Sequence, residues 1–167
     1  MSVTRLETFF ITLCRAGILL AFGALILSVL IQVLGRTFGS SPVWTEELTR
    51  FALLYIAAFG AGLSLRSGDL VNVDIVCESL KGNWPWRLRL LSALCTAGLC
   101  TILILPAWQY VSIGRLQTSP AVEVRMDFVH ASVLVLLFIL LVFSLIRIIG
   151  MVLGSDQGLP DRKEEVS

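Results

Sequence analysis

The sequence predicts an all-α membrane protein with four transmembrane helices and both termini in the cytoplasm. First, 56% of the 167 residues are hydrophobic and only 15% are charged, whereas soluble domains have about 45–50% apolar and roughly a quarter charged residues. Second, long stretches lack any charge. Third, lysine and arginine fall unevenly on the two sides that such helices would separate. We expect one four-helix domain over residues 1–153 and a charged, disordered cytoplasmic tail over residues 154–167.

Uncharged stretches locate the helices, because a membrane span needs about 20 predominantly apolar residues. These stretches cover residues 16–35, 51–65, 90–114 and 128–146. With their flanks, they predict membrane spans at about residues 14–35, 45–66, 88–110 and 128–150. No cleavable signal peptide is expected, because the first apolar stretch is long and lacks a small-residue cleavage pattern.

The basic residues predict the orientation. With the amino terminus inside, nine of the 13 lysines and arginines lie on the cytoplasmic side and four lie outside. The positive-inside rule therefore places both termini in the cytoplasm. Cys77 is then expected inside, and a cysteine introduced at Ser119, in the polar second outer loop, is expected to react from outside.

The first 15 residues mix charged with apolar side chains, so we expect a short amphipathic lead-in to the first span, lying in the membrane interface. Between the second and third spans, residues 69–80 again place apolar residues at helical spacing. They predict a short interfacial amphipathic helix.

The second span begins with charged residues, in the sequence WTEELTR. Its uncharged stretch has 15 residues, or roughly 22 Å at about 1.5 Å each, against a hydrocarbon core of about 30 Å. The charged turns must therefore complete the crossing. Glu46 and Glu47 precede Arg50 by four and three residues, so either acid can meet it on one helix face. Trp44 suits the aromatic belt of the interface.

Two interpretations of these charges remain open. The turn is either an anchored, solvated helix start, or part of a polar joint with the first helix or with a partner. The joint would contain Arg36, Glu46, Glu47 and Arg50, because a charge at membrane depth usually faces protein rather than lipid.

Small residues four apart predict close helix packing. In the second span they pair as Ala57/Ala61, Ala58/Gly62 and Gly60/Ser64, and in the third as Ala93/Ala97. Such ridges let backbones approach closely in lipid. The fourth span has almost only large apolar residues, so we expect it to have more lipid-facing character.

No residue pattern predicts catalysis, a cofactor or a metal site. The single histidine, His130, excludes haem ligation by paired histidines within the chain, and we expect it to be an interfacial or a helix-packing residue. A small drug exporter would need an acid inside the first span, and a membrane thiol oxidase would need cysteine pairs in the outer loops. Neither is present. No acid lies in the middle of a span, as a coupled transporter would require, so we expect an accessory subunit.

Residues 35–76, GRTF…SPVWTEELTRFALLYIAAFGAGLSLRSGDLVNVDIV, resemble the small membrane subunit of tripartite ATP-independent periplasmic (TRAP) transporters. The positions that match the family pattern are Arg36, Trp44, Glu46, Glu47, Arg50, Gly60, Arg66 and Gly68. Asp69 stands where the family usually has histidine, and the resemblance makes it, with the charged positions and Trp44, a candidate structural or partner-contacting residue.

The resemblance implies an accessory subunit in the bacterial inner membrane. It would brace a large membrane subunit that takes up an organic acid anion with sodium, after delivery by a periplasmic binding protein. The alternative is a structural or assembly subunit of another inner-membrane complex, which would show the same four apolar helices.

Overall fold

The computed structural model describes residues 2–40, 42–67 and 84–153. These residues form four helices, α1 (Ser2–Thr37), α2 (Trp44–Ser67), α4 (Trp84–Gly114) and α5 (Met126–Val152). Each is long and apolar enough to cross a membrane, which confirms the all-helical class and the four predicted helices. The orientation of the termini stays a prediction. The interfacial helix expected over residues 69–80, Asp69 and the tail all lie outside the described residues.

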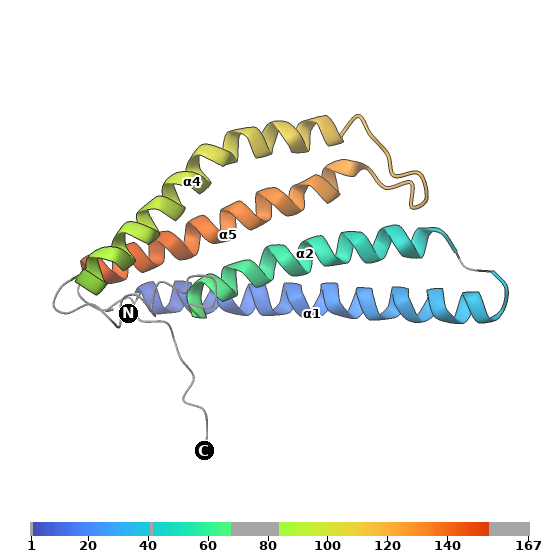
Figure 1. Ribbon diagram of the computed structural model, residues 1–167, viewed down its shortest axis with the longest axis horizontal. Helices are drawn as coiled ribbons and strands as arrows, with labels where there is room; N and C mark the ends of the chain where they lie inside the picture. The colour runs from blue at the N-terminus through green and yellow to red at the C-terminus, as the bar shows by residue number, and fades with distance from the viewer. Residues whose placement is uncertain (1, 41, 68–83, 154–167) are drawn as a thin grey trace, which may run out of the picture.

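The helices lie side by side in an open layer instead of closing into a bundle. Along the layer the order is α1, α2, α5, α4, as Figure 1 shows. Each helix packs on the next, α1 also touches α5 slightly, and within the described residues α4 contacts neither α1 nor α2. The layer thus consists of two antiparallel hairpins, α1–α2 and α4–α5, that meet along α2 and α5.

Helix α1 is continuous over its 36 residues. The amphipathic lead-in expected over the first 15 residues is thus continuous with the first span, and its place in the membrane interface stays a prediction. The reason for this continuity lies in packing, because Ile11 and Cys14 are buried in one apolar cluster with Leu65 of α2 and with Ile139 and Phe143 of α5. These contacts hold the amino-terminal turns of α1 in line with the rest of the helix.

Helix α5 is the central helix, which corrects the expectation that it faces lipid most. It contacts all three other helices. Its Ile139 and Phe143 pack toward α1 and α2, and its Leu137 packs on Cys100 and Ala107 of α4. Large apolar residues suit a helix interface and lipid equally well, so the composition of α5 did not reveal its place in the layer.

Small residues bring the helices together at the predicted ridges. Ala58 and Gly62 of α2 are buried, and a Cβ on Gly62 would overlap Cγ2 of Ile139 in α5. Gly17 of α1 lies so close to α2 that a Cβ there would be 2.7 Å from the Phe59 ring. Helix α4 presents a buried stripe to α5 made of Ala93, Ala97, Cys100, Ala107, Val111 and Gly114.

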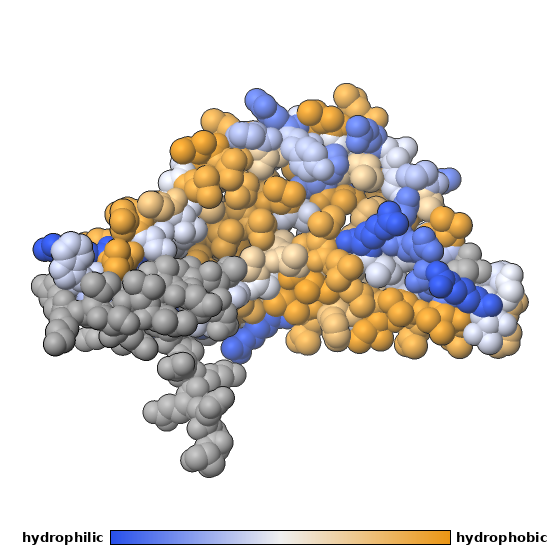
Figure 2. All heavy atoms as spheres, viewed as in Figure 1, coloured by the Kyte–Doolittle hydropathy of each residue, from blue (hydrophilic) through white to orange (hydrophobic). Residues whose placement is uncertain are grey.

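The surface of the layer is largely apolar. Figure 2 shows hydrophobic residues over much of the visible face, with hydrophilic residues gathered mainly toward the ends of the helices. This distribution is what a protein surrounded by lipid or by other membrane helices requires.

Candidate functional site

The first turn of α2 connects the two hairpins because Glu46 and Glu47 point in different directions. Adjacent residues of an α-helix lie about 100° apart around its axis. Glu46 consequently faces α1, whereas Glu47 faces the connection between α4 and α5. We call these two carboxylates and their partners the polar joint.

Glu46 links the α2 start to the end of α1. Its Oε1 accepts a hydrogen bond from Gln32 Nε2 at 3.2 Å and lies 3.6 Å from Arg36 Nη2. The Arg36 and Glu46 side chains are 66% and 48% exposed, so solvent screens this pair strongly. The structure thus brings together two residues that the sequence placed in the joint.

Glu47 binds the α4–α5 connection through one oxygen. Its Oε2 accepts a hydrogen bond from the Ser119 hydroxyl, and the backbone N–H groups of Ala121 and Val122 each lie 3.3 Å away as donors. Hydrogen bonds to a carboxylate are stronger than those between neutral groups. Glu47 therefore anchors the start of one hairpin to the turn of the other.

The connection itself has a defined shape that presents these donors. Ser119 N donates to Val124 O at 2.9 Å, Met126 N donates to Gln117 O at 2.9 Å, and Thr118 forms a single antiparallel bridge with Arg125. The short ladder folds residues 119–122 into a tight turn whose N–H groups converge on Glu47.

The structure corrects the predicted exposure of Ser119 in the second outer loop. The sequence suggested an accessible position, but Ser119 is only 2% exposed. Its hydroxyl donates a hydrogen bond to Glu47. The two residues are 72 positions apart in the sequence, so local spacing does not predict this contact.

Arg50 does not pair with either acid. It is exposed, and in the described part of the chain no hydrogen bond or ion pair joins it to Glu46 or Glu47. The expected contacts within the helix are absent because Glu46 turns to α1 and Glu47 turns to the α4–α5 connection. Trp44 is the first residue of α2 and is partly exposed.

Two further contacts fasten α2 and α4 to α5 near the joint. The Tyr55 hydroxyl donates to the backbone carbonyl of Phe128 at 2.5 Å. His130 Nδ1 donates to the Tyr110 carbonyl at 3.0 Å, its ring stacks on the Tyr110 ring, and Gly114 leaves the space it occupies. His130 therefore packs between helices as expected. Tyr55 was missed, although a phenol in an apolar span requires a hydrogen-bond partner.

At the opposite end, Arg66 of α2 pairs with Glu7 of α1. Arg66 Nε lies 2.8 Å from Glu7 Oε1, and the side chains are 30% and 26% exposed. Arg66 was a candidate from the sequence, but Glu7 was not. Which charged residues of two helices can pair depends on how the helices are aligned along each other. The sequence alone does not give that alignment.

These contacts are structural in character. Among the residues that the structure describes, no group of three or more histidine, cysteine, aspartate or glutamate side chains could hold a metal ion. The arrangement can fix two hairpins against each other at the joint and two helices at the Arg66 end.

Comparison with known proteins identifies one family. The family model described as tripartite ATP-independent periplasmic transporters, DctQ component, matches residues 25–154. No curated protein matches the chain. The matched range contains the whole polar joint and leaves out Glu7. It favours the transporter interpretation over a subunit of another inner-membrane complex.

Proposed function

Since the chain belongs to the family of DctQ components of tripartite ATP-independent periplasmic transporters, we propose that it is the accessory subunit that braces a large membrane subunit. In this proposal the large subunit carries out sodium-coupled uptake of an organic acid anion. A periplasmic binding protein delivers that anion, and the complex lies in the bacterial inner membrane with both termini of this chain inside.

The open layer is the observation that supports a bracing role. A transport route needs walls on all sides, whereas α4 meets neither α1 nor α2 in the described residues. Large apolar side chains such as Leu19, which is 72% exposed, require lipid or another membrane protein beside them. A flat layer of this kind suits the flank of a larger membrane protein.

The polar joint supports the same role. A brace must resist sliding of one hairpin past the other, and lipid supplies little net drive against such sliding. The hydrogen bonds from Ser119, Ala121 and Val122 to Glu47 fix that relative position at one end of the layer.

Reconstitution into proteoliposomes tests the proposal. The chain alone is expected to move no organic acid anion. Uptake is expected when the large subunit, the binding protein and an inward sodium gradient are all supplied, and it should fall to background when this chain alone is left out. Uptake by the chain alone, or full uptake without it, would contradict the bracing role.

A further inference from the structure

Helix α4 consists of two segments that meet at Pro106. This proline lies inside the helix, and it has no N–H to donate to the carbonyl four residues earlier, which belongs to Ile102. Helices bend at such positions, and Figure 1 shows α4 changing direction about midway along its length. The turn from Ile102 to Pro106 is therefore a place where the two segments can rotate relative to each other. We call residues 84–105 the first segment and residues 107–114 the second segment.

The second segment is fixed to α5. His130 Nδ1 donates to the Tyr110 carbonyl at 3.0 Å, and the two rings stack with their centroids 3.8 Å apart. Gly114 lies so close to α5 that a Cβ there would be 2.6 Å from His130 Nδ1. The chain then continues into the connection that binds Glu47. The second segment is thus held in place by contacts on both sides of its end.

Ser144 of α5 belongs to a row of side chains that faces α4. Buried residues recur along α5 at every seventh position, namely His130, Leu137, Ser144 and Met151. Seven residues differ from two full helical turns by only about 20°, so these residues form one row. His130 stacks on Tyr110 of α4, and Leu137 packs on Ala107 of α4. The row, including Ser144, therefore points toward α4.

Ser144 lies beside the first segment of α4. The two helices are antiparallel, and Leu137 is level with the stretch between Cys100 and Ala107. Since Ser144 is seven residues further along α5, it lies about seven residues earlier along α4 than the middle of that stretch. The buried residues of α4 near this level are Ala93 and Ala97. Their small side chains leave the backbone of α4 within easier reach of the Ser144 hydroxyl.

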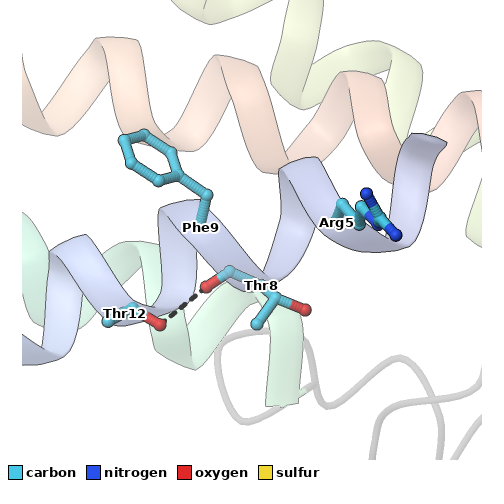
Figure 3. A pocket seen from close by; sticks show the side chains of 4 residues that line it. All are labelled: Arg5, Thr8, Phe9 and Thr12. Atoms are coloured by element: carbon cyan, nitrogen blue, oxygen red, sulfur yellow. Dashed lines mark hydrogen bonds between the residues drawn. The ribbon is translucent and has the colours of Figure 1, made fainter.

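The Ser144 hydroxyl lacks a hydrogen-bond partner in this arrangement. Ser144 is 1% exposed, and its Oγ is a buried polar atom without a partner among the described residues. Other hydroxyls in these helices donate to a carbonyl about one turn earlier, as Thr12 Oγ1 does to the Thr8 carbonyl at 2.8 Å in Figure 3. Ser132 does the same with the Val129 carbonyl at 2.6 Å. A buried donor without an acceptor destabilises the arrangement that contains it, and lipid offers no substitute.

We propose that α4 and α5 have a second packing arrangement, in which the first segment of α4 turns about Pro106 and the Ser144 hydroxyl donates to the Ala93 carbonyl. Ala93 is the more suitable acceptor, because the Ala97 carbonyl already accepts a hydrogen bond from Thr101 Oγ1 at 2.8 Å. Among the described helices α4 contacts only α5, so no other helix opposes this rotation. The edge of the layer thereby has two positions. The proposal does not depend on the bracing role.

Double electron–electron resonance on the full-length chain in lipid nanodiscs tests this inference. The native cysteines are replaced by alanine, and spin labels are attached at Leu91 in the first segment and Ile149 in α5, which are both exposed. A second pair of labels, at the exposed Ile113 and Phe128, reports on the second segment. The first pair is expected to give two distances, whereas the second pair should give one.

Two substitutions should change the ratio of these distances, and a third is the matched control. Ser144→Ala removes the unpaired hydroxyl and should shift the ratio toward the described arrangement by about fivefold or more. Pro106→Ala restores the missing backbone N–H and should leave the first pair with a single distance. Ser132→Ala removes a hydroxyl that is also buried in α5 but already has an acceptor. This control should leave the ratio within about twofold of the unsubstituted chain.

Three results would overturn the proposal. The first is a single distance for the Leu91–Ile149 pair in the unsubstituted background. The second is an unchanged ratio after Ser144→Ala, which would mean that the hydroxyl finds its acceptor on α5 itself. The third is the persistence of two distances in Pro106→Ala, which would place the rotation elsewhere. Circular dichroism should give equal helix content for all variants, so that a loss of folding is recognised.

Discussion

Glu46 and Glu47 are adjacent in the sequence but make different kinds of contact. The Glu46 carboxylate meets an exposed arginine across a distance of 3.6 Å. The Glu47 carboxylate instead collects one hydroxyl and two backbone N–H donors from a distant turn. Only the second contact crosses from one hairpin to the other, so we expect Glu47 to matter more for stability.

Substitutions at Glu47 should lower thermal stability in a fixed order. Glu47→Gln keeps an acceptor oxygen and should have the smallest effect. Glu47→Ala removes the acceptor, and Glu47→Lys also places a cation against three donors, so the loss should increase in that order. The measurement is the unfolding midpoint of the purified chain in detergent, followed by tryptophan fluorescence. Glu165→Lys in the tail is the control, and equal small effects at both positions would support a merely solvated helix start.

The two ion pairs of α1 and α2 should differ in strength. Arg36→Gln is expected to lower the free energy of unfolding by less than about 1 kcal/mol, because the Arg36–Glu46 pair is exposed. Arg66→Gln should cost more, about 1–3 kcal/mol, because it strands the partly buried Glu7 carboxylate.

Denaturant unfolding of both variants at low and high salt checks this difference. Added salt should reduce the Arg36 effect more than the Arg66 effect, because exposed charges are screened more. Equal sensitivity of the two variants to salt would contradict the assigned exposures.

The sequence predicted Arg36, Glu46, Glu47 and Arg50 as residues of the polar joint, and the structure brings Arg36 to Glu46 but leaves Arg50 apart from both acids. Arg36, Glu46 and Glu47 were identified because a short apolar stretch forces charges toward the membrane. Ser119 and Tyr55 were missed because their contacts depend on which helices become neighbours. A charge can be recognised from local sequence, whereas its partner depends on the tertiary arrangement.

At the scale of helices, the uncharged stretches predicted the number and approximate position of the four elements. The role of α5 could not be predicted, because a helix core and a lipid tail are equally apolar. The small-residue ridges were more informative. Gly62 of α2 lies against α5, and Ala93 and Ala97 are buried on α4, whose only described helix neighbour is α5, since a small residue is needed only where a backbone comes close.

Two glycines of α2 should respond oppositely to alanine. Gly62→Ala places a methyl group onto Cγ2 of Ile139 and is expected to cost about 1–3 kcal/mol by overpacking. Gly60→Ala meets no atom within 4 Å, so it should change stability by less than about 1 kcal/mol, toward greater stability.

Chemical denaturation of the two variants measures the contrast. Adding Ile139→Leu to Gly62→Ala removes the Cγ2 methyl group that the new alanine would overlap. The double variant should therefore recover part of the lost free energy of unfolding. Equal effects of the two glycine variants, or no recovery in the double variant, would mean that α2 and α5 are not in close contact at Gly62.

For the molecule as a whole, the predicted orientation yields a labelling experiment. A cysteine at Gln117, which is exposed, should react with a membrane-impermeant thiol reagent in intact spheroplasts. A cysteine at the buried Ser119 should react much more slowly, although it lies only two residues away. Native Cys77 should react only after the membrane is opened. Labelling of Cys77 first would reverse the orientation.

The division into two hairpins also has a consequence for how the chain is made. Helices α1 and α2 are neighbours in sequence and in space, so their contacts can form before the second half is synthesised. The α4–α5 hairpin then docks on the α2 face already in place, and no described helix contact depends on an unbroken backbone between Ser67 and Trp84. Domains and subdomains with local contacts generally assemble early and as units. Two co-expressed pieces, residues 1–67 and 84–167, should therefore find each other in the membrane and co-purify, with Glu47 as the residue on which their recombination most depends.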